Sequence, residues 1–204
     1  LVNNANGSRT IVNRSLPHAE FIVDVEAMMR FSPHVLLFDG HALKASLVAM
    51  EAFPNAISIL DAGSWRQGTA TLASRVDILA ASERFALQCS QLDSLRTDEL
   101  RRICVNRMRE RYVNSIVVTL GEYGYIVDDG SGFNHESAFP VEAIDTTAAG
   151  DIFHGALAYA VAESMPLMQS LRFASMTAAL SVQQRGGRSS IPDLSQVEQA
   201  LQRS

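Results

Sequence analysis

The chain has 204 residues, of which 47% are hydrophobic and 19% are charged, and this composition excludes a disordered segment and a mini-protein. At roughly 100–200 residues per domain, the length predicts one domain or two small ones. The net charge of −5, with Lys44 as the single lysine among 17 basic residues, disfavours a nucleic-acid partner, because binding to a phosphate backbone requires clustered positive charge.

The sequence predicts neither a membrane span nor a disulfide framework. The longest uninterrupted apolar stretch, residues 155–162, is far shorter than the ~20 residues that cross a bilayer. Cys89 and Cys104 are isolated thiols without metal-ligand spacing, which predicts reduced core cysteines and a cytoplasmic location. Because the chain opens at Leu1 without an initiator Met or a signal pattern, we expect it to be truncated.

Helices and strands are predicted to alternate along the first half of the chain. Residues 3–8 are rich in Asn, Gly and Ser and precede the β-branched segment 9–13, which predicts a short strand pair. Hydrophobic periodicity then predicts helices over residues 23–31, 41–52, 68–74, 83–90 and 97–111, and strands over residues 34–38, 56–61, 76–80 and 115–120.

The second half of the chain predicts a short meander followed by helices. Strands over residues 124–128 and 133–139 follow the strand over residues 115–120 so closely that we expect antiparallel pairing. The apolar spacing that follows predicts helices over residues 150–163, 167–184 and 194–203.

This alternation predicts a three-layer, doubly wound α/β fold with a mostly parallel central sheet. Ligands of such a fold bind at the carboxyl ends of the strands. We expect residues 1–13 to form a small appended sheet and residues 14–204 to form one domain, because no change of composition marks a linker between them.

The segment from Asp145 to Ala156, DTTAAGDIFHGA, places two acids around small residues that open a predicted helix. Small residues leave the first backbone N–H groups of a helix open to a ligand, and the helix dipole favours an anion there. Asp151 can accept a proton from an attacking hydroxyl, as phosphoryl transfer requires. The alternative is a capping box in which Thr147 is the N-cap and Asp151 a first-turn acid, and the residues alone leave both open.

Two further turns carry glycine pairs. Gly121 and Gly124 follow a predicted strand, where they permit a tight turn beside a ligand or close a hairpin. Gly186 and Gly187 follow a predicted helix, where they cap the helix or let the loop over residues 184–192 present carbonyls and hydroxyls to a nucleotide or a cation.

In this order and spacing, the three segments resemble the ribokinase-type (PfkB) carbohydrate kinases, particularly ketohexokinase-like and sulfofructose-kinase-like members. The family signature is DTTGAGD followed by xFxGA, and it is matched by residues 145–156. The TLGxxG turn and the late FAxxxAA…GG…IP pattern of the family are matched by Thr119-Leu120-Gly121 with Gly124, Phe173-Ala174, Ala178-Ala179, Gly186-Gly187 and Ile191-Pro192. The resemblance implies a ribokinase-like fold in which residues 1–13 are the remnant of a β lid.

The resemblance also implies ATP-dependent phosphorylation of a sugar hydroxyl, with Mg²⁺ bridging the phosphates of ATP. It implies that Asp151 is the general base and that the N–H groups of residues 148–150 (Ala148, Ala149 and Gly150) form an anion hole. The nucleotide-lining residues that it implies are Thr119, Gly121, Gly124, Thr147, Ser175, Ala178 and Gly187. A monovalent cation and a homodimer formed through the lid are further implications.

Three residues are candidates for substrate contact: Asp39, Arg66 and Asp145. The guanidinium of Arg66 suits a phosphate, but the residue can equally lie on the surface above Trp65. Asp39 at a strand end can face the substrate or form a turn. The histidines lack metal-ligand spacing, and we expect His154 to pack in the interior.

The chain departs from the family pattern in three ways. Ala148 replaces a glycine, so a backbone angle that glycine alone adopts freely would cost free energy there. The NxxE metal motif aligns with residues 82–85, which retain only Glu83 as a candidate Mg²⁺ ligand. The given residues do not include the sugar-binding motifs of the family's N-terminal third, and we expect these motifs to lie upstream of Leu1. These departures keep open the alternative of a non-catalytic relative that binds a nucleotide or a sugar.

Overall fold

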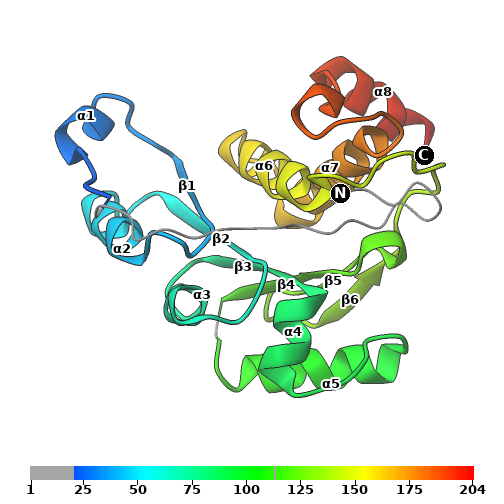
Figure 1. The fold of residues 1–204 in the computed structure, drawn as a ribbon, viewed down its shortest axis with the longest axis horizontal. Helices are drawn as coiled ribbons and strands as arrows, with labels where there is room; N and C mark the ends of the chain where they lie inside the picture. Colours follow the sequence, from blue (N-terminus) through cyan, green and yellow to red (C-terminus); the bar gives the residue numbers. More distant parts are fainter. Residues whose placement is uncertain (1–20, 113) are drawn as a thin grey trace. The chain divides into compact units, whose positions relative to one another are not determined.

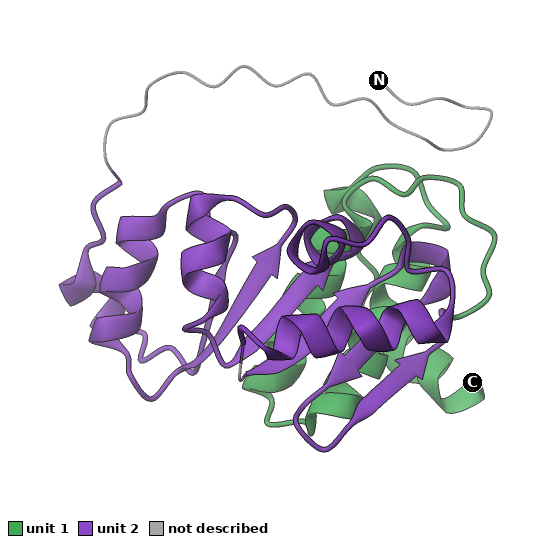
Figure 2. Ribbon diagram, turned by 90° about the horizontal axis from the view of Figure 1, so that it is seen from below, with its two compact units in different colours: residues 1–20, 139–204 green, residues 21–138 purple. Residues whose placement is uncertain are grey.

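The computed structural model describes residues 21–112 and 114–204, and the chain divides into two compact units (Figures 1 and 2). Unit 2 is residues 21–138, and the described part of unit 1 is residues 139–204. The strand pair and lid predicted for residues 1–13 lie outside the described residues.

Unit 2 contains a six-stranded sheet whose strands follow the order of the sequence. The pairs β1–β2, β2–β3 and β3–β4 are parallel, whereas β4–β5 and β5–β6 are antiparallel, so the predicted meander is confirmed. The elements of this unit are α1 (Val25–Met29), β1 (Val35–Phe38), α2 (Leu43–Ala52), β2 (Ile57–Ala62), α3 (Gln67–Ala73), β3 (Ile78–Ser82), α4 (Glu83–Ser90), α5 (Asp98–Arg109), β4 (Ser115–Thr119), the 3₁₀ turn η1 (Gly121–Tyr123), β5 (Tyr125–Asp128) and β6 (Phe133–Glu136).

The main core of unit 2 lies between one face of the sheet and helices α3 to α5. Because parallel crossovers are right-handed and the strands keep their sequence order, the connecting helices fall on one face, as Figure 2 shows. Strand residues Leu60, Leu79 and Ile116 are fully buried there against Phe85 of α4 and Cys104 of α5. The predicted mostly parallel α/β fold is confirmed.

Unit 1 is helical in its described part, with α6 (Ala149–Ala162), α7 (Leu167–Ser181), the 3₁₀ turn η2 (Arg188–Ser190) and α8 (Leu194–Arg203). Helices α6 and α7 pack against each other through small and branched residues, including the fully buried Leu157, Ala160, Leu171 and Ala174. Helix α8 begins with a capping box between Asp193 and Gln196 and buries Val197.

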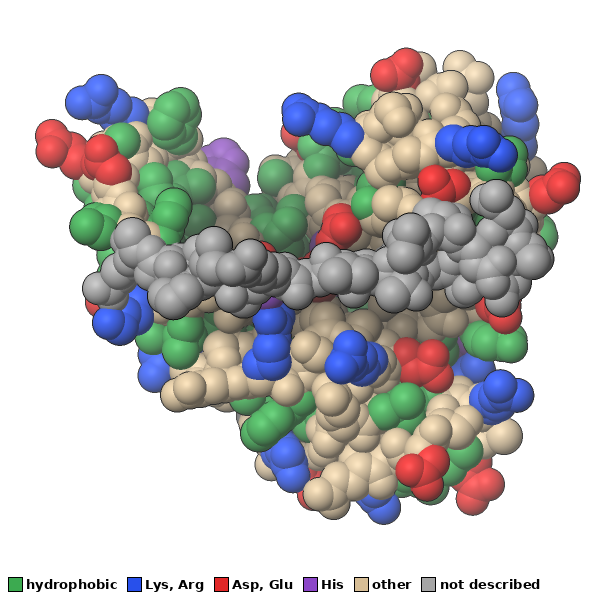
Figure 3. Space-filling model, in the orientation of Figure 1, with side chains coloured by type: hydrophobic (Ala, Val, Ile, Leu, Met, Phe, Trp, Pro, Cys, Tyr) green, Lys and Arg blue, Asp and Glu red, His purple; other side chains and the backbone are tan. Residues whose placement is uncertain are grey.

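The distribution of charged side chains and the lengths of the helices agree with what the composition predicts. Basic and acidic side chains are interspersed on the face shown in Figure 3. Among the residues that the structure describes, no helix combines the length and the apolar character needed to cross a bilayer.

Candidate active site

The turn that opens α6 holds a residue in the left-handed region. Ala148 is the N-cap of α6 with φ 59° and ψ 14°, a conformation that costs an L-residue roughly 1–2 kcal/mol. The turn thus keeps a glycine-like backbone although a methyl group has replaced the glycine. The N-cap is Ala148 and it makes no side-chain cap hydrogen bond, so the alternative of a capping box with Thr147 as N-cap is wrong.

The first turn of α6 presents open N–H groups beside an exposed carboxylate. Asp151 lies in this turn and is exposed. The N–H of Ala149 donates to the carbonyl of Thr146 at 3.3 Å, whereas those of Ala148 and Gly150 have no acceptor among the described residues. A Cβ added to Gly150 would meet nothing within 4 Å, so the space around this N–H is open. The geometry suits an anion at this turn.

Asp145 connects this turn to the loop after α7. Its Oδ1 accepts the Thr147 N–H at 2.9 Å, and its Oδ2 accepts the Gly186 N–H at 2.9 Å. A Cβ on Gly187 would lie 3.1 Å from the Cβ of Ala148, so the two segments touch where glycine leaves room. The structure therefore brings together the first and third sequence-predicted segments.

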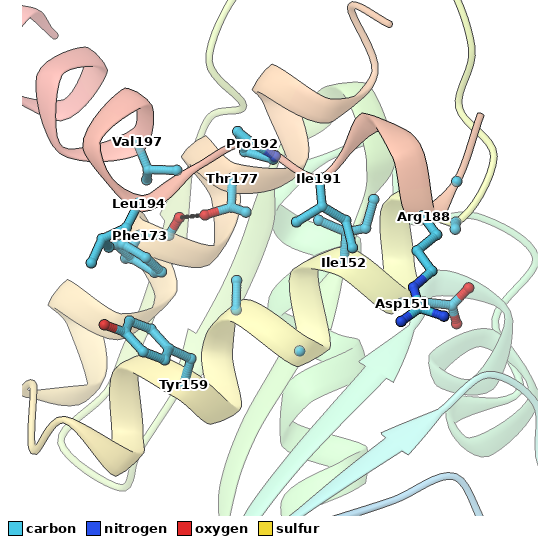
Figure 4. Close-up of a pocket in the computed structure, with 14 residues that line it drawn as sticks. Asp151, Ile152, Tyr159, Phe173, Thr177, Arg188, Ile191, Pro192, Leu194 and Val197 are labelled. Atoms are coloured by element: carbon cyan, nitrogen blue, oxygen red, sulfur yellow. Dashed lines mark hydrogen bonds between the residues drawn. The ribbon is translucent and has the colours of Figure 1, made fainter. Parts of the chain in front are cut away.

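A cavity of about 560 Å³ runs from this turn along α6 (Figure 4). Asp151 and Arg188 lie at one end of it, and Tyr159 and Phe173 lie at the other. The remaining residues that line it are Ala148, Ile152, Gly155, Ala156, Thr177, Gly187, Ile191, Pro192, Leu194 and Val197.

Two residues of helix α7 line this cavity, and they differ from the two nucleotide-lining residues that the family resemblance implies on this helix. Phe173 and Thr177 line the cavity, and the Thr177 hydroxyl donates to the Phe173 carbonyl at 2.8 Å. Ser175 is buried and Ala178 is partly buried, and neither is among the lining residues. His154 is buried and packs edge-on against the Phe153 ring, as expected for a packing residue.

In unit 2, the turn after β4 depends on two glycines with positive φ. Gly121 adopts φ +59° and Gly124 adopts φ +87°. A Cβ on Gly124 would lie 2.0 Å from the Glu136 carbonyl oxygen, so only glycine fits against β6. The N–H of Leu120 donates to the Gly124 carbonyl at 2.7 Å, and this hydrogen bond holds Thr119 at the start of the same turn.

The loops after β1 and β2 carry the other two substrate candidates. Asp39 is exposed and its Oδ1 accepts the His41 N–H at 2.8 Å, which is the turn-forming role considered for it. The Arg66 guanidinium contacts the His41 ring, with Nη2 lying 3.2 Å from Nε2. Trp65 is 47% exposed, so it is not buried beneath the arginine.

The segment aligned with the metal motif forms a helix start. Ser82 is the N-cap of α4: its Oγ accepts the Phe85 N–H at 3.2 Å and donates to the Gly63 carbonyl at 2.8 Å. Glu83 is partly buried in the first turn. No group of three or more His, Cys, Asp and Glu side chains in the described ranges is arranged to hold a metal. One carboxylate is still compatible with Mg²⁺, which usually retains waters and binds substrate phosphates.

Comparison with known proteins identifies the family of the chain. Residues 14–194 match the pfkB family of carbohydrate kinases. The chain belongs to this family. The ribokinase of Lactococcus lactis is 34% identical over 99 residues, which are 48% of this chain and 33% of the relative. The Schizosaccharomyces pombe ribokinase is 42% identical over 85 residues, or 41% of this chain and 27% of that protein.

Solved structures give the PfkB chain a ribokinase-like fold. A putative ribokinase from Agrobacterium tumefaciens superposes with a TM-score of 0.82 at 27% identity, covering 99% of this chain and 66% of that one. Arabidopsis thaliana ribokinase complexed with ribose and ATP gives 0.76 at 25% identity, covering 90% and 60%. The chain therefore matches about a quarter to a third of the length of the curated relatives named above and about two thirds of the length of these structures.

Sequence reasoning missed two features of this PfkB chain. The link from Asp145 to Gly186 joins residues 41 positions apart, and no local pattern announces it. His41 was not a candidate, because an isolated histidine has no spacing signal; its position one residue after Gly40 at a strand end was the only available sign.

Proposed function

We propose that this PfkB-family protein transfers the γ-phosphoryl group of ATP to a sugar hydroxyl. The observation that carries the proposal is the first turn of α6, where the exposed Asp151 carboxylate shares one helical turn with the open Gly150 N–H. Phosphoryl transfer needs a proton acceptor and hydrogen-bond donors for the developing charge. The relatives named ribokinase support a sugar as the acceptor.

In the proposed reaction, Asp151 accepts the proton of the sugar hydroxyl as its oxygen bonds to the γ-phosphorus. The bond from this phosphorus to the bridging oxygen breaks, and ADP leaves with the electron pair. The N–H groups of Ala148, Ala149 and Gly150 form the anion hole for the transferring oxygens. Mg²⁺, when bound, neutralises charge on the phosphates, and Glu83 is the residue of this chain assigned to hold it.

The residues that we propose for nucleotide contact are given for each unit by itself. In unit 2 these residues are Thr119, Gly121 and Gly124. The assignment is supported by the turn after β4, whose two glycines adopt positive φ and carry no side chain that would block a ligand. In unit 1 they are Thr147 and Gly187, and Gly187 is supported by its position at the cavity beside Asp151. Ser175 and Ala178 do not line that cavity and stay predictions.

The substrate side of the proposal rests on Arg66, Asp39 and Asp145. The carboxylates of Asp39 and Asp145 accept hydrogen bonds from backbone N–H groups. The Arg66 guanidinium contacts the His41 ring instead. A monovalent cation in the loop over residues 184–192 and a homodimer through residues 1–13 stay predictions.

A screen of ADP release by the full-length protein tests the proposed activity. The acceptor panel comprises fructose, ribose, 2-keto-3-deoxygluconate and sulfofructose, with ATP and Mg²⁺ present. We expect ADP release that depends on one of these sugars. If the protein binds nucleotide or sugar but releases no ADP with any acceptor, the kinase proposal fails and the non-catalytic alternative replaces it.

A further inference from the structure

We propose that His135 is a positioning residue, which fixes the turn after β4 for the nucleotide by donating a hydrogen bond to the Tyr123 carbonyl. This turn is η1, and His135 lies on β6 of the same unit. The hydrogen bond belongs to the structure, whereas the contact of this turn with ATP rests on the proposed function.

The turn η1 buries no side chain that could anchor it. Gly121, Glu122 and Tyr123 are all exposed, and Tyr123 is 52% exposed. The Tyr123 N–H donates to the Leu120 carbonyl at 3.2 Å, and the Gly124 N–H donates to the Gly121 carbonyl at 3.1 Å. These hydrogen bonds close the turn on itself without joining it to another element.

Glycines at both ends make this turn costly to order. Gly121 adopts φ +59° and Gly124 adopts φ +87°, and glycine has more backbone freedom to lose than any other residue. Gly124 is confined, because a Cβ there would lie 2.0 Å from the Glu136 carbonyl oxygen. A Cβ on Gly121 would meet nothing within 4 Å, so that end has open space. A contact between the two ends therefore determines how well the turn is ordered.

His135 supplies that contact from β6. Its Nε2 lies 2.9 Å from the Tyr123 carbonyl oxygen. A carbonyl oxygen only accepts hydrogen bonds, so Nε2 carries the proton and donates it. Within the part of the chain that the structure describes, no other side chain is hydrogen-bonded to a backbone group of residues 121–123. The His135 side chain therefore joins this turn to the sheet and reduces the ordering that a bound nucleotide would require.

Arg101 of α5 orients the His135 ring. The Arg101 side chain is 7% exposed; its Nε donates to the Leu95 carbonyl at 2.8 Å, and its Nη1 donates to Asp98 Oδ1 at 2.8 Å. Nη1 also lies 3.1 Å from His135 Nδ1 and 3.3 Å from His135 Nε2. Because Nε2 is the donor to Tyr123, the acceptor for Nη1 is Nδ1. Both ring nitrogens are thus engaged, and the ring is held between α5 and the turn.

Calorimetric ATP binding by the full-length protein tests the positioning role. His135→Ala is expected to weaken ATP binding by about 3–10-fold, the effect of one net hydrogen bond. His135→Gln should restore most of the affinity, because the glutamine amide N–H can donate to the Tyr123 carbonyl in place of Nε2. His34→Ala is the matched control, because His34 is exposed and precedes β1.

Two NMR readouts test the hydrogen bond itself, without any nucleotide. Nitrogen chemical shifts of the imidazole distinguish a protonated Nε2 from a protonated Nδ1, and we expect the proton of His135 on Nε2. Amide hydrogen exchange reports local opening of the turn. The N–H groups of Tyr123 and Gly124 should exchange faster in His135→Ala than in the wild type, and His135→Gln should restore their protection. Circular dichroism checks that every variant is folded.

Two results would overturn the hydrogen bond: a His135 proton on Nδ1 alone, or turn N–H groups that exchange equally fast in His135→Ala and the wild type. Faster exchange in His135→Ala with an unchanged ATP affinity would overturn the positioning role, as would equal losses of affinity in the Ala and Gln variants. None of these readouts depends on ADP release, so failure of the kinase proposal and failure of the positioning role are distinguishable.

Discussion

The two units hold their proposed ligand-binding groups by different means. In unit 1, the turn before α6 is built from backbone: Ala148 adopts a left-handed conformation, Gly187 leaves room beside it, and N–H groups face outward. In unit 2, the loop carrying Arg66 is built from side chains that reach it from other elements. A site formed by backbone groups requires small residues at consecutive positions, which are visible as a motif in the sequence. A site formed by side chains from several elements has no such motif.

The largest effect is expected at the backbone-built turn. Asp151→Asn removes the proposed proton acceptor and should lower kcat by about 10²–10⁴-fold, the contribution of a general base. The affinity for ATP should change little, because the N–H groups of the turn are retained. Steady-state kinetics and calorimetric ATP binding check the two quantities, with the exposed Glu198→Gln as the control acid. An unchanged kcat in Asp151→Asn would show that another group takes the proton.

In unit 2, two glycines of the turn after β4 allow the cost of backbone strain to be measured apart from the cost of a steric clash. Gly124→Ala should destabilise the protein by about 2–4 kcal/mol, because it adds a left-handed strain and a Cβ 2.0 Å from the Glu136 carbonyl oxygen. Gly121→Ala has a similar positive φ but open space, so we expect a loss of only about 1 kcal/mol. Urea denaturation measures the unfolding free energy of both variants. Equal losses would contradict the predicted steric clash at Gly124.

The core of unit 2 should weaken at alkaline pH. Burial, together with the neighbouring Cys89 thiol, raises the pKa of Tyr112 from 10.0 to about 12. Since the folded state keeps the proton longer than the unfolded state, the contribution of Tyr112 to stability is fully present below pH 10 and is lost between pH 10 and 12, by about 2 kcal/mol. Burial raises the pKa of Cys104 as well and acts in the same direction.

Tyr112→Phe is the matched variant for this pH effect. The phenol is buried and its hydroxyl contacts Cys89 Sγ at 3.9 Å, so phenylalanine retains the packing without an ionisable group. Unfolding free energies measured by urea at several pH values should fall less steeply above pH 10 in this variant. An identical slope in both proteins would assign the alkaline loss to other groups.

The smallest expected effect returns to unit 1. Ala148→Gly should stabilise the protein by about 1 kcal/mol, because glycine adopts φ 59° without a Cβ penalty, a gain reduced by its greater freedom when unfolded. Ala158→Gly, in the interior of the same helix, should instead cost about 1 kcal/mol. Thermal unfolding of the two variants gives the comparison, and destabilisation by Ala148→Gly would contradict the strain.

Much of the fold was predictable, because hydrophobic periodicity reports which elements form. The parallel strands and the meander were predicted, and α4 and α8 have the expected bounds. Element ends were less predictable: β6 ends at Glu136 rather than at residue 139, and α7 ends at Ser181 rather than at residue 184. Just after α7, the Val182 carbonyl accepts the N–H groups of residues 144 and 145, a long-range pairing that periodicity does not report.

The candidate site was predictable only where it is local in sequence. Residues 145–151 are consecutive, so their pattern alone predicted an anion site at the start of α6, which stays a prediction. The partners of the Arg66 loop come from positions such as Ser82 and Gln88, which lie 19 and 23 residues from their hydrogen-bonding partners. Pairing at that distance depends on the packing of α4 and β2, which no spacing rule encodes.

Transfer of labelled phosphate from γ-labelled ATP to a sugar tests the central claim most directly. The full-length protein and its Asp151→Asn variant are incubated with ATP, Mg²⁺ and the sugar that gives ADP release, and the products are separated. We expect labelled sugar phosphate with the wild type and almost none with Asp151→Asn at matched ATP occupancy. Labelled inorganic phosphate without labelled sugar, or equal labelling by both proteins, would contradict it.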